Sequence, residues 1–223
     1  GKIEKPEAVR NFDDILEAAD GIMIARGDLG VELPPQEVPV IQKSIIRKCN
    51  RRGKMVITAT QMLESMIHNA VPTRAETSDV ANAVWDGTDV VMLSGETSVG
   101  EYAIETVEMM QRILVQTEAN MDLVQYERKE RPLTVEETIF DSVGKALSDM
   151  AVQLHAEAVV SFTRRGRMAK AMSKFRPNTR IVAMSDSFEV MNVLRLIWGI
   201  IPIYFEDVTD EQTAIKIAKK ILL

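Results

Sequence analysis

The sequence predicts an α/β protein, and three observations support this prediction. Three short apolar runs, residues 21–25, 55–59 and 89–93, have the length of strands, and their centres are 34 residues apart. Each run is followed by polar or glycine residues and then by a segment with apolar residues at helical spacing. Strand–helix repeats of this length form parallel sheets with right-handed crossovers.

The first half is expected to contain four strand–helix units. Residues 1–4 are predicted to be the end of one further strand, ahead of the three apolar runs. Three of the following helices are expected to bury apolar sets, namely Val9, Phe12, Leu16 and Ala19, then Val38, Ile41, Ile45 and Cys49, and then Ile104, Val107, Met110 and Leu114.

The second half is predicted to form a separate, smaller α/β domain with a mainly parallel sheet. Thr134 and Glu137 fit a capping box that begins a new helix. Beyond this helix the pattern predicts three strands and an amphipathic last helix, at residues 158–162, 180–184, 200–205 and 211–223.

A polar stretch separates the two halves. Residues 122–134 are polar and contain Pro132, as is typical of an interdomain linker. We therefore divide the chain into a first domain of residues 1–118, a linker of residues 119–133 and a second domain of residues 134–223. Because the chain starts within a predicted strand and stops within a predicted helix, we expect a truncated second domain and a longer parent protein.

Composition excludes several classes of protein. The formal net charge is −6 and charges of both signs are mixed, so a nucleic-acid partner is not expected. No apolar run approaches the roughly 20 residues that span a bilayer, so no membrane partner is expected either. Cys49 is the single cysteine and there are only two histidines, which argues against disulfides and zinc and favours the cytoplasm.

Reactive side chains gather at the predicted strand ends. Parallel α/β proteins place their functional residues at the carboxyl ends of strands. The four strands of the first domain end in four polar sets, which are Lys2 with Glu4, Arg26-Gly27-Asp28, Thr60-Gln61 and Ser94-Gly95-Glu96. Each set alone is also compatible with a solvated face or a simple turn.

Taken together, these sets predict metal-assisted chemistry on a small anion. Glu4 and Asp28 on neighbouring strand ends suit a hard cation such as Mg²⁺. Gly27 permits close approach of the backbone to a ligand, and a helical turn starting near Asp28 would attract an anion. Lys2 beside a metal-bound anion would stabilise a transferring phosphoryl group or an enolate, and the residues alone leave the reaction open.

Four stretches of this sequence resemble the pyruvate kinase family. They are KIE at 2–4, MIARGDLGVELP at 23–34, ITATQMLESMI at 57–67 and PTRAETSDVANAVWDGTDVVMLSGETSVGEY at 72–102. The resemblance implies the last strands and helices of a TIM (β/α)8 barrel, strands six to eight, followed by most of a C-terminal α/β regulatory domain. It is much weaker after about residue 115.

The resemblance also implies roles for individual residues. Lys2 would stabilise the transferring phosphoryl group, and Glu4 and Asp28 would bind Mg²⁺ or Mn²⁺. The backbone amides of Gly27 and Asp28 would hold the substrate carboxylate. The Thr60 hydroxyl would contact the substrate near the carbon that is protonated. Three more residues would have supporting roles, Arg26 as an anchor of its loop and Ser94 and Glu96 as a polar relay.

The activity implied is transfer of a phosphoryl group from phosphoenolpyruvate to ADP, giving pyruvate and ATP in glycolysis. The resemblance further implies a cytoplasmic homotetramer that requires K⁺. By the same resemblance, the potassium ligands and most of the nucleotide site would lie upstream of these 223 residues. The chain alone is therefore expected to be inactive.

An effector site is a further expectation for the second domain. Many family members bind a phosphorylated effector on a loop that matches SFTRRGRMAKAMSKF at 161–175. Thr163, Arg164, Gly166 and Arg167 would suit a phosphate, while Met168 replaces the small hydroxyl residue common there. A basic turn before a helix is the alternative interpretation of the same residues.

Two other functions compete with the kinase. A related Mg²⁺-dependent barrel, an aldolase or lyase acting through a pyruvate enolate, would share Glu4 and Asp28 but not the stretches after residue 57. The other is a non-catalytic binding or assembly module whose second domain senses a sugar phosphate or a nucleotide.

Overall fold

The computed structural model describes residues 1–121, 134–206 and 211–222, and the chain divides into two compact units, Gly1–Asp122 and Leu123–Leu223. Most of the expected linker, residues 122–133, lies outside the described residues. None of the described helices has the length and apolar character needed to cross a membrane.

A parallel four-stranded sheet in the order β1-β2-β3-β4 forms the first unit. Its strands are β1 (Lys2–Ile3), β2 (Gly21–Ala25), β3 (Met55–Ala59) and β4 (Val90–Met92). The helices between and after them are α1 (Pro6–Arg10), α2 (Phe12–Ala18), α3 (Arg26–Glu32), α4 (Val38–Arg52), α5 (Arg74–Trp85), α6 (Gly95–Ser98) and α7 (Ala103–Ala119), with 3-10 turns at Pro35–Glu37 and Glu64–Ile67. The strand predictions are confirmed, while the helix expected through residues 9–19 is divided at Asn11.

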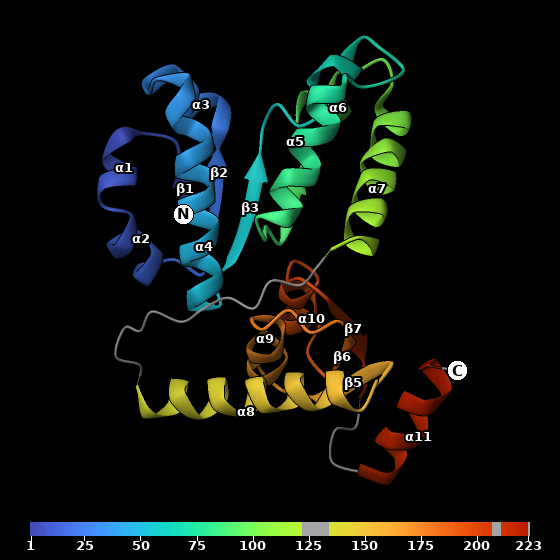
Figure 1. Ribbon diagram of the computed structural model, residues 1–223. Coiled ribbons are helices and arrows are strands. Elements are labelled where there is room, and N and C mark those ends of the chain that lie inside the picture. Colours follow the sequence, from blue (N-terminus) through green and yellow to red (C-terminus); the bar gives the residue numbers. More distant parts are fainter. Residues whose placement is uncertain (122–133, 207–210, 223) are drawn as a thin grey trace. The chain divides into compact units, whose positions relative to one another are not determined.

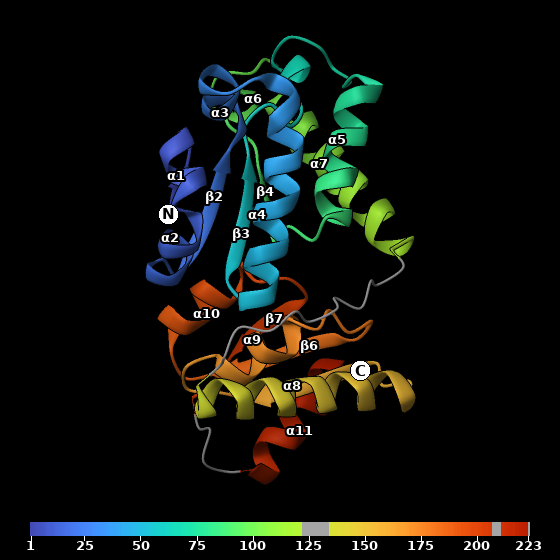
Figure 2. The same cartoon turned by 60° about the vertical axis from the view of Figure 1, so that its left-hand side comes forward.

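The core of the first unit lies between the sheet and its helices. Ile22 and Ile24 alternate along β2, so both point to one face of the sheet, where they pack against α2 and α4. Helix α4 runs along β2 and β3 (Figure 1, Figure 2). It buries Ile45 and Cys49 as predicted and ends at Gly53, whose φ of 64° forms a left-handed cap.

The predicted buried face of α7 is wrong in part. Ile104 and Val107 are 74% and 52% exposed, and the helix instead buries a stripe through Thr106, Met110, Ile113 and Thr117. The two threonines can be buried because their hydroxyls donate to helix carbonyls one turn earlier. Apolar periodicity favoured the stripe through Ile104 and Val107 because it counts only apolar residues. It does not take into account that a threonine hydroxyl can be buried when it donates to a carbonyl of its own helix.

The second unit is a parallel three-stranded sheet in the order β5-β6-β7. Its elements are α8 (Val135–Gln153), β5 (Ala158–Phe162), α9 (Arg167–Ser173), β6 (Arg180–Ser185), α10 (Phe188–Leu194), β7 (Ile200–Tyr204) and α11 (Glu211–Leu222). The predicted capping box is confirmed, because the Thr134 hydroxyl accepts the Glu137 N–H and the Glu137 carboxylate accepts the Thr134 N–H.

Both faces of this second sheet are covered. Ile181 and Ala183 of β6 pack on one face in a cluster with residues of α9 and α10, while Val182 and Met184 pack on the other with Ala218 of α11. Helix α8 lies against α9 (Figure 1). The fold of the chain is thus α/β with parallel sheets in both units, as predicted.

Candidate active site

The polar sets of the first three strands meet at the carboxyl edge of the first sheet. The strand register pairs Ile3 with Ile24 and Ala25 with Ala59. Glu4 is therefore level with Ala25, and Arg26 and Thr60 directly follow the last paired residues of β2 and β3. Helix α3 begins at Arg26, which places Gly27 and Asp28 in its first turn. The sequence predicted this edge, and it left open a helical turn near Asp28, which the structure has.

Lys2 lies between the two predicted metal ligands. Its Nζ is 2.5 Å from Glu4 Oε2 and donates to Asp28 Oδ2 at 2.9 Å. Hydrogen bonds to Glu4 and then to Asp28 raise the pKa of the Lys2 ammonium, and the bond from Lys2 lowers the pKa of Asp28. The lysine therefore stays protonated and the aspartate ionised at neutral pH.

These two carboxylates fit a magnesium ion. They already converge on one cation, the ammonium of Lys2, and their side chains are 36% and 54% exposed. Within the described ranges no group of three or more His, Cys, Asp or Glu could hold a metal ion. Two carboxylates suffice for Mg²⁺, which usually keeps several waters and takes its remaining ligands from a substrate.

The turn after β3 has an uncommon backbone. Thr60 and Gln61 have φ of 69° and 53°, in the left-handed region that a β-branched residue rarely adopts. This conformation brings the Thr60 hydroxyl to Gly27, whose N–H donates to Thr60 Oγ1 at 2.8 Å, and the hydroxyl itself donates to the Ala59 carbonyl at 2.6 Å. Two predicted substrate contacts, Gly27 and Thr60, are thus in direct contact.

Arg26 supports this turn from its buried side. The side chain is 9% exposed, and its guanidinium donates to the Thr60 carbonyl at 2.6 Å and to the Gln61 carbonyl at 3.1 Å. It also pairs with Asp79 of α5 at 2.6 Å, and Gln42 of α4 accepts a longer bond. The expectation that Arg26 anchors its loop agrees with these contacts.

Glu96 is buried behind the same edge. One carboxylate oxygen accepts the Leu63 N–H at 3.1 Å and the other accepts the Ser94 N–H at 2.7 Å. The side chain thereby ties the segment after β3 to the segment after β4. These contacts are structural, and the relay role expected for Ser94 and Glu96 stays a prediction.

The predicted effector loop lies in the second unit. Gly166 has φ of 73° and precedes α9, and its N–H donates to the Thr163 hydroxyl at 2.8 Å. Arg167 pairs with Glu136 and lies over the ring of Phe140, while Arg164 is exposed. The loop brings the four predicted residues together, but Thr163 and Arg167 already have partners within the chain.

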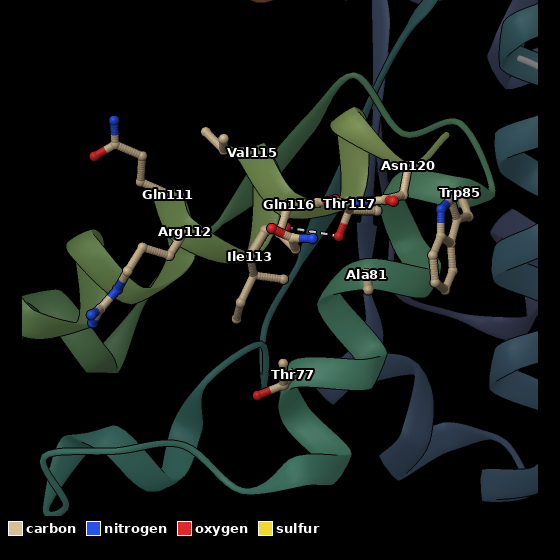
Figure 3. A pocket seen from close by; sticks show the side chains of 10 residues that line it. All are labelled: Thr77, Ala81, Trp85, Gln111, Arg112, Ile113, Val115, Gln116, Thr117 and Asn120. Atoms are coloured by element: carbon tan, nitrogen blue, oxygen red, sulfur yellow. Dashed lines mark hydrogen bonds between the residues drawn. The ribbon is translucent and has the colours of Figure 1, made fainter. Parts of the chain in front are cut away.

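A groove between α5 and α7 is separate from these residues. Figure 3 shows side chains of the two helices facing it, and it contains none of the predicted site residues. It is lined by Thr77, Ala81, Trp85, Gln111, Arg112, Ile113, Val115, Gln116, Thr117 and Asn120.

Asp79 and Gln42 are the contacts that sequence reasoning missed. Both lie on helices that follow the strands, at polar positions that periodicity assigns to solvent. A buried arginine at residue 26 requires a carboxylate partner, but nothing in the sequence indicates that this partner is 53 residues away.

A parallel strand–helix repeat with polar side chains collected at the carboxyl edge of the sheet is the arrangement of parallel α/β proteins, TIM barrels among them. The model of the pyruvate kinase barrel domain matches residues 1–107, and that of the pyruvate kinase alpha/beta domain matches residues 141–223. The chain belongs to the pyruvate kinase family.

Most of this chain is similar in sequence to known pyruvate kinases. Those of Sporosarcina psychrophila and Geobacillus stearothermophilus are each 50% identical, over 91% and 89% of this chain. The crystal structure of a pyruvate kinase from Cryptosporidium parvum superposes with a TM-score of 0.92 at 39% identity, covering all of this chain and 46% of that one. The chain spans 34% of the length of the two curated relatives.

Proposed function

We propose that this chain supplies part of the active site of a pyruvate kinase, which transfers a phosphoryl group from phosphoenolpyruvate to ADP in a magnesium-dependent reaction. The observation that supports it is the contact of Lys2 with both Glu4 and Asp28 at the carboxyl edge of the sheet. The substrates in this proposal are those of the pyruvate kinase family, and the geometry of the Lys2, Glu4 and Asp28 cluster is compatible with them.

Each residue of the cluster has a role in this proposal. Lys2 carries a positive charge that its neighbours stabilise, and this charge would offset the negative charge of the transferring phosphoryl group. The Gly27 and Asp28 amides at the start of α3 would bind the carboxylate of the substrate. This binding requires the Gly27 N–H to leave the Thr60 hydroxyl, which frees that hydroxyl to face the substrate.

Glu4 and Asp28 would hold Mg²⁺ or Mn²⁺, which supplies charge neutralisation at the substrate oxygens when bound. The side chain of Thr60, held by its turn, would orient the proton donor for the enolate carbon. We further propose that residues 134–223 form part of the regulatory domain, with an effector phosphate near Thr163, Arg164, Gly166 and Arg167. The intact protein would be a cytoplasmic homotetramer that uses K⁺ bound outside this chain.

The test is an assay of pyruvate formation from phosphoenolpyruvate and ADP by the intact protein that contains this chain. Lys2→Met and Asp28→Asn are each expected to lower kcat/KM by about a thousandfold or more while the fold is preserved. Lys5→Met, at an exposed lysine three positions along, is the control and is expected to retain turnover. Near-wild-type rates in either site variant would contradict the site assignment.

The same preparation distinguishes the main rival. A wild-type protein that binds a sugar phosphate but forms no pyruvate would be a binding module, and the kinase proposal would be wrong. Circular dichroism of each variant verifies that a lost rate is not a lost fold.

A further inference from the structure

The turn at Thr60 and Gln61 requires an external support. Two successive non-glycine residues in the left-handed region are unfavourable, and a threonine is disfavoured there by its branched Cβ. Such a turn persists only where its surroundings hold it. The carbonyls of both residues accept hydrogen bonds from Arg26, at 2.6 Å and 3.1 Å to its Nη2 atom.

Arg26 can hold the turn only if its own orientation is fixed. The guanidinium is a rigid planar fork, so fixing one nitrogen sets the direction of the other two. Its Nη1 donates to Asp79 Oδ2 at 2.6 Å, whereas Gln42 Oε1 accepts from the same nitrogen only at 3.4 Å. The Asp79 carboxylate is therefore the short, charge-assisted contact that orients the fork.

Asp79 itself lies on a well-anchored helix. Helix α5 starts with a capping box between Thr73 and Glu76 and buries Val80 and Ala83 close to Asp79 in sequence. The contacts thus lead from Asp79, on this capped helix, to Arg26, and from Arg26 to the backbone of Thr60 and Gln61. No member of this chain of contacts except Thr60 is a predicted substrate contact.

We propose that Asp79 is a positioning residue that holds the Thr60 hydroxyl at the reacting carbon through Arg26. The catalytic consequence rests on the proposed function. In the step concerned, the electron pair of the enolate double bond forms a C–H bond with a proton from an O–H group oriented by Thr60, and the donor oxygen regains its proton from solvent. The enolate becomes the ketone of pyruvate.

The variant that tests this proposal is Asp79→Asn, which keeps the shape of the side chain and removes its charge. The matched control is Asp86→Asn, which removes a carboxylate at the end of the same helix, where it pairs with Lys43 of α4. Asp79→Glu keeps the charge and tests rescue. Arg26→Lys keeps the positive charge but cannot bridge Asp79 and Thr60.

The first readout is structural and uses the intact protein that contains this chain. Backbone chemical shifts, or a crystal structure, report whether Thr60 and Gln61 keep their left-handed conformation. We expect Asp79→Asn and Arg26→Lys to shift the turn toward ordinary backbone angles, and Asp86→Asn to leave it unchanged. An unchanged Thr60 in a folded Asp79→Asn protein would overturn the proposal.

The second readout is kinetic and uses the intact protein. In Asp79→Asn, kcat and the rate at which pyruvate exchanges its methyl protons with D₂O are expected to fall by about tenfold to a hundredfold, with KM for phosphoenolpyruvate changing little. Asp79→Glu should recover part of the loss. Equal losses in Asp86→Asn, or a change confined to KM, would contradict a positioning role.

The two readouts separate this inference from the proposed function. If the wild-type protein forms no pyruvate, the proposed function is wrong, and the turn conformation in Asp79→Asn still decides whether Asp79 positions Thr60. If the wild type is active and the turn moves without loss of proton exchange, the catalytic part of the inference is wrong.

Discussion

Burial decides the chemistry of the single cysteine. Cys49 is fully buried on α4, and burial raises the pKa of its thiol to about 12. Since the thiolate is the reactive form, we expect no labelling of the folded protein by a thiol reagent at mildly alkaline pH and complete labelling in denaturant. A Val99→Cys protein, whose new thiol replaces a side chain 76% exposed, should label at once as a positive control. Rapid labelling of native Cys49 would contradict its burial.

Lys2 also makes a testable contribution to metal affinity. Its ammonium lies between Glu4 and Asp28, so a divalent cation must compete with a positive charge that is already there. We expect Lys2→Met to bind Mg²⁺ or Mn²⁺ several-fold more tightly than the wild-type chain, because the competing charge is gone. Isothermal titration of the two proteins measures the difference. Weaker binding by Lys2→Met would show that the carboxylates do not form the metal site.

Residue types and strand ends were sufficient to predict Lys2, Glu4, Asp28 and Thr60 as a group, because parallel strands bring their carboxyl ends to one edge. The support for Thr60 was not predictable in the same way. It depends on a side-chain contact between α3 and α5 and on a left-handed backbone at a threonine, and neither has a signal in local sequence.

At the scale of elements, α5 depends on a capping box at its start. Although partial burial would raise the pKa of Glu76, the hydrogen bonds that its carboxylate accepts from Ser65 and Thr73 lower this pKa below the usual 4.5. A lowered folded-state pKa stabilises the protein above the unfolded value, and this contribution is lost as pH falls through the folded value. Stability from this cap is thus present at neutral pH and decreases below about pH 4.5.

The corresponding prediction concerns Glu76→Gln. We expect this protein to be less stable than the wild type at neutral pH, by on the order of 1 kcal/mol, and the difference to shrink as the pH falls below 4.5. Urea denaturation across this pH range measures it. Glu108→Gln, at an exposed position of α7, serves as the control. A difference that grows on acidification would mean that the Glu76 carboxylate is not stabilised in its ionised form by the fold.

Helices α8 and α9 meet at a glycine. A Cβ at Gly144 would lie 2.8 Å from the backbone carbon of Ala171 and 2.9 Å from its oxygen, closer than real Cβ atoms approach. We expect Gly144→Ala to destabilise the second unit by about 1–3 kcal/mol, despite the higher helix propensity of alanine. Thermal denaturation measures it, and Gly30→Ala, where a Cβ would meet nothing within 4 Å, is the control.

The bounds of helices and strands could be predicted from the sequence where a single physical rule determined them. The apolar runs of β2, β3 and β5 gave their strand bounds because buried parallel strands are continuous apolar segments. The prediction of the buried face of α7 was wrong in part because this helix carries two stripes that could each be buried. The tertiary contacts with α5 determine which stripe is buried, and the stripe that they bury contains two threonines.

At the scale of the whole molecule, the exposure of the candidate site limits what these residues can do alone. The side chains of Lys2, Glu4 and Asp28 are 52%, 36% and 54% exposed at the edge of a four-stranded sheet. Phosphoryl transfer depends on holding donor and acceptor in line and on strong electrostatics in a site that excludes water. A cluster this open is solvated, so its charges interact more weakly than in a closed site.

We therefore expect the purified 223-residue polypeptide to bind divalent cations weakly and to form no pyruvate from phosphoenolpyruvate and ADP. A lactate dehydrogenase-coupled assay measures the second property, and the mass of the polypeptide is verified by mass spectrometry. The intact protein assayed in parallel shows that the reagents work. Turnover by the verified 223-residue polypeptide would mean that two carboxylates, one lysine and a supported threonine turn suffice for the reaction even in an exposed site.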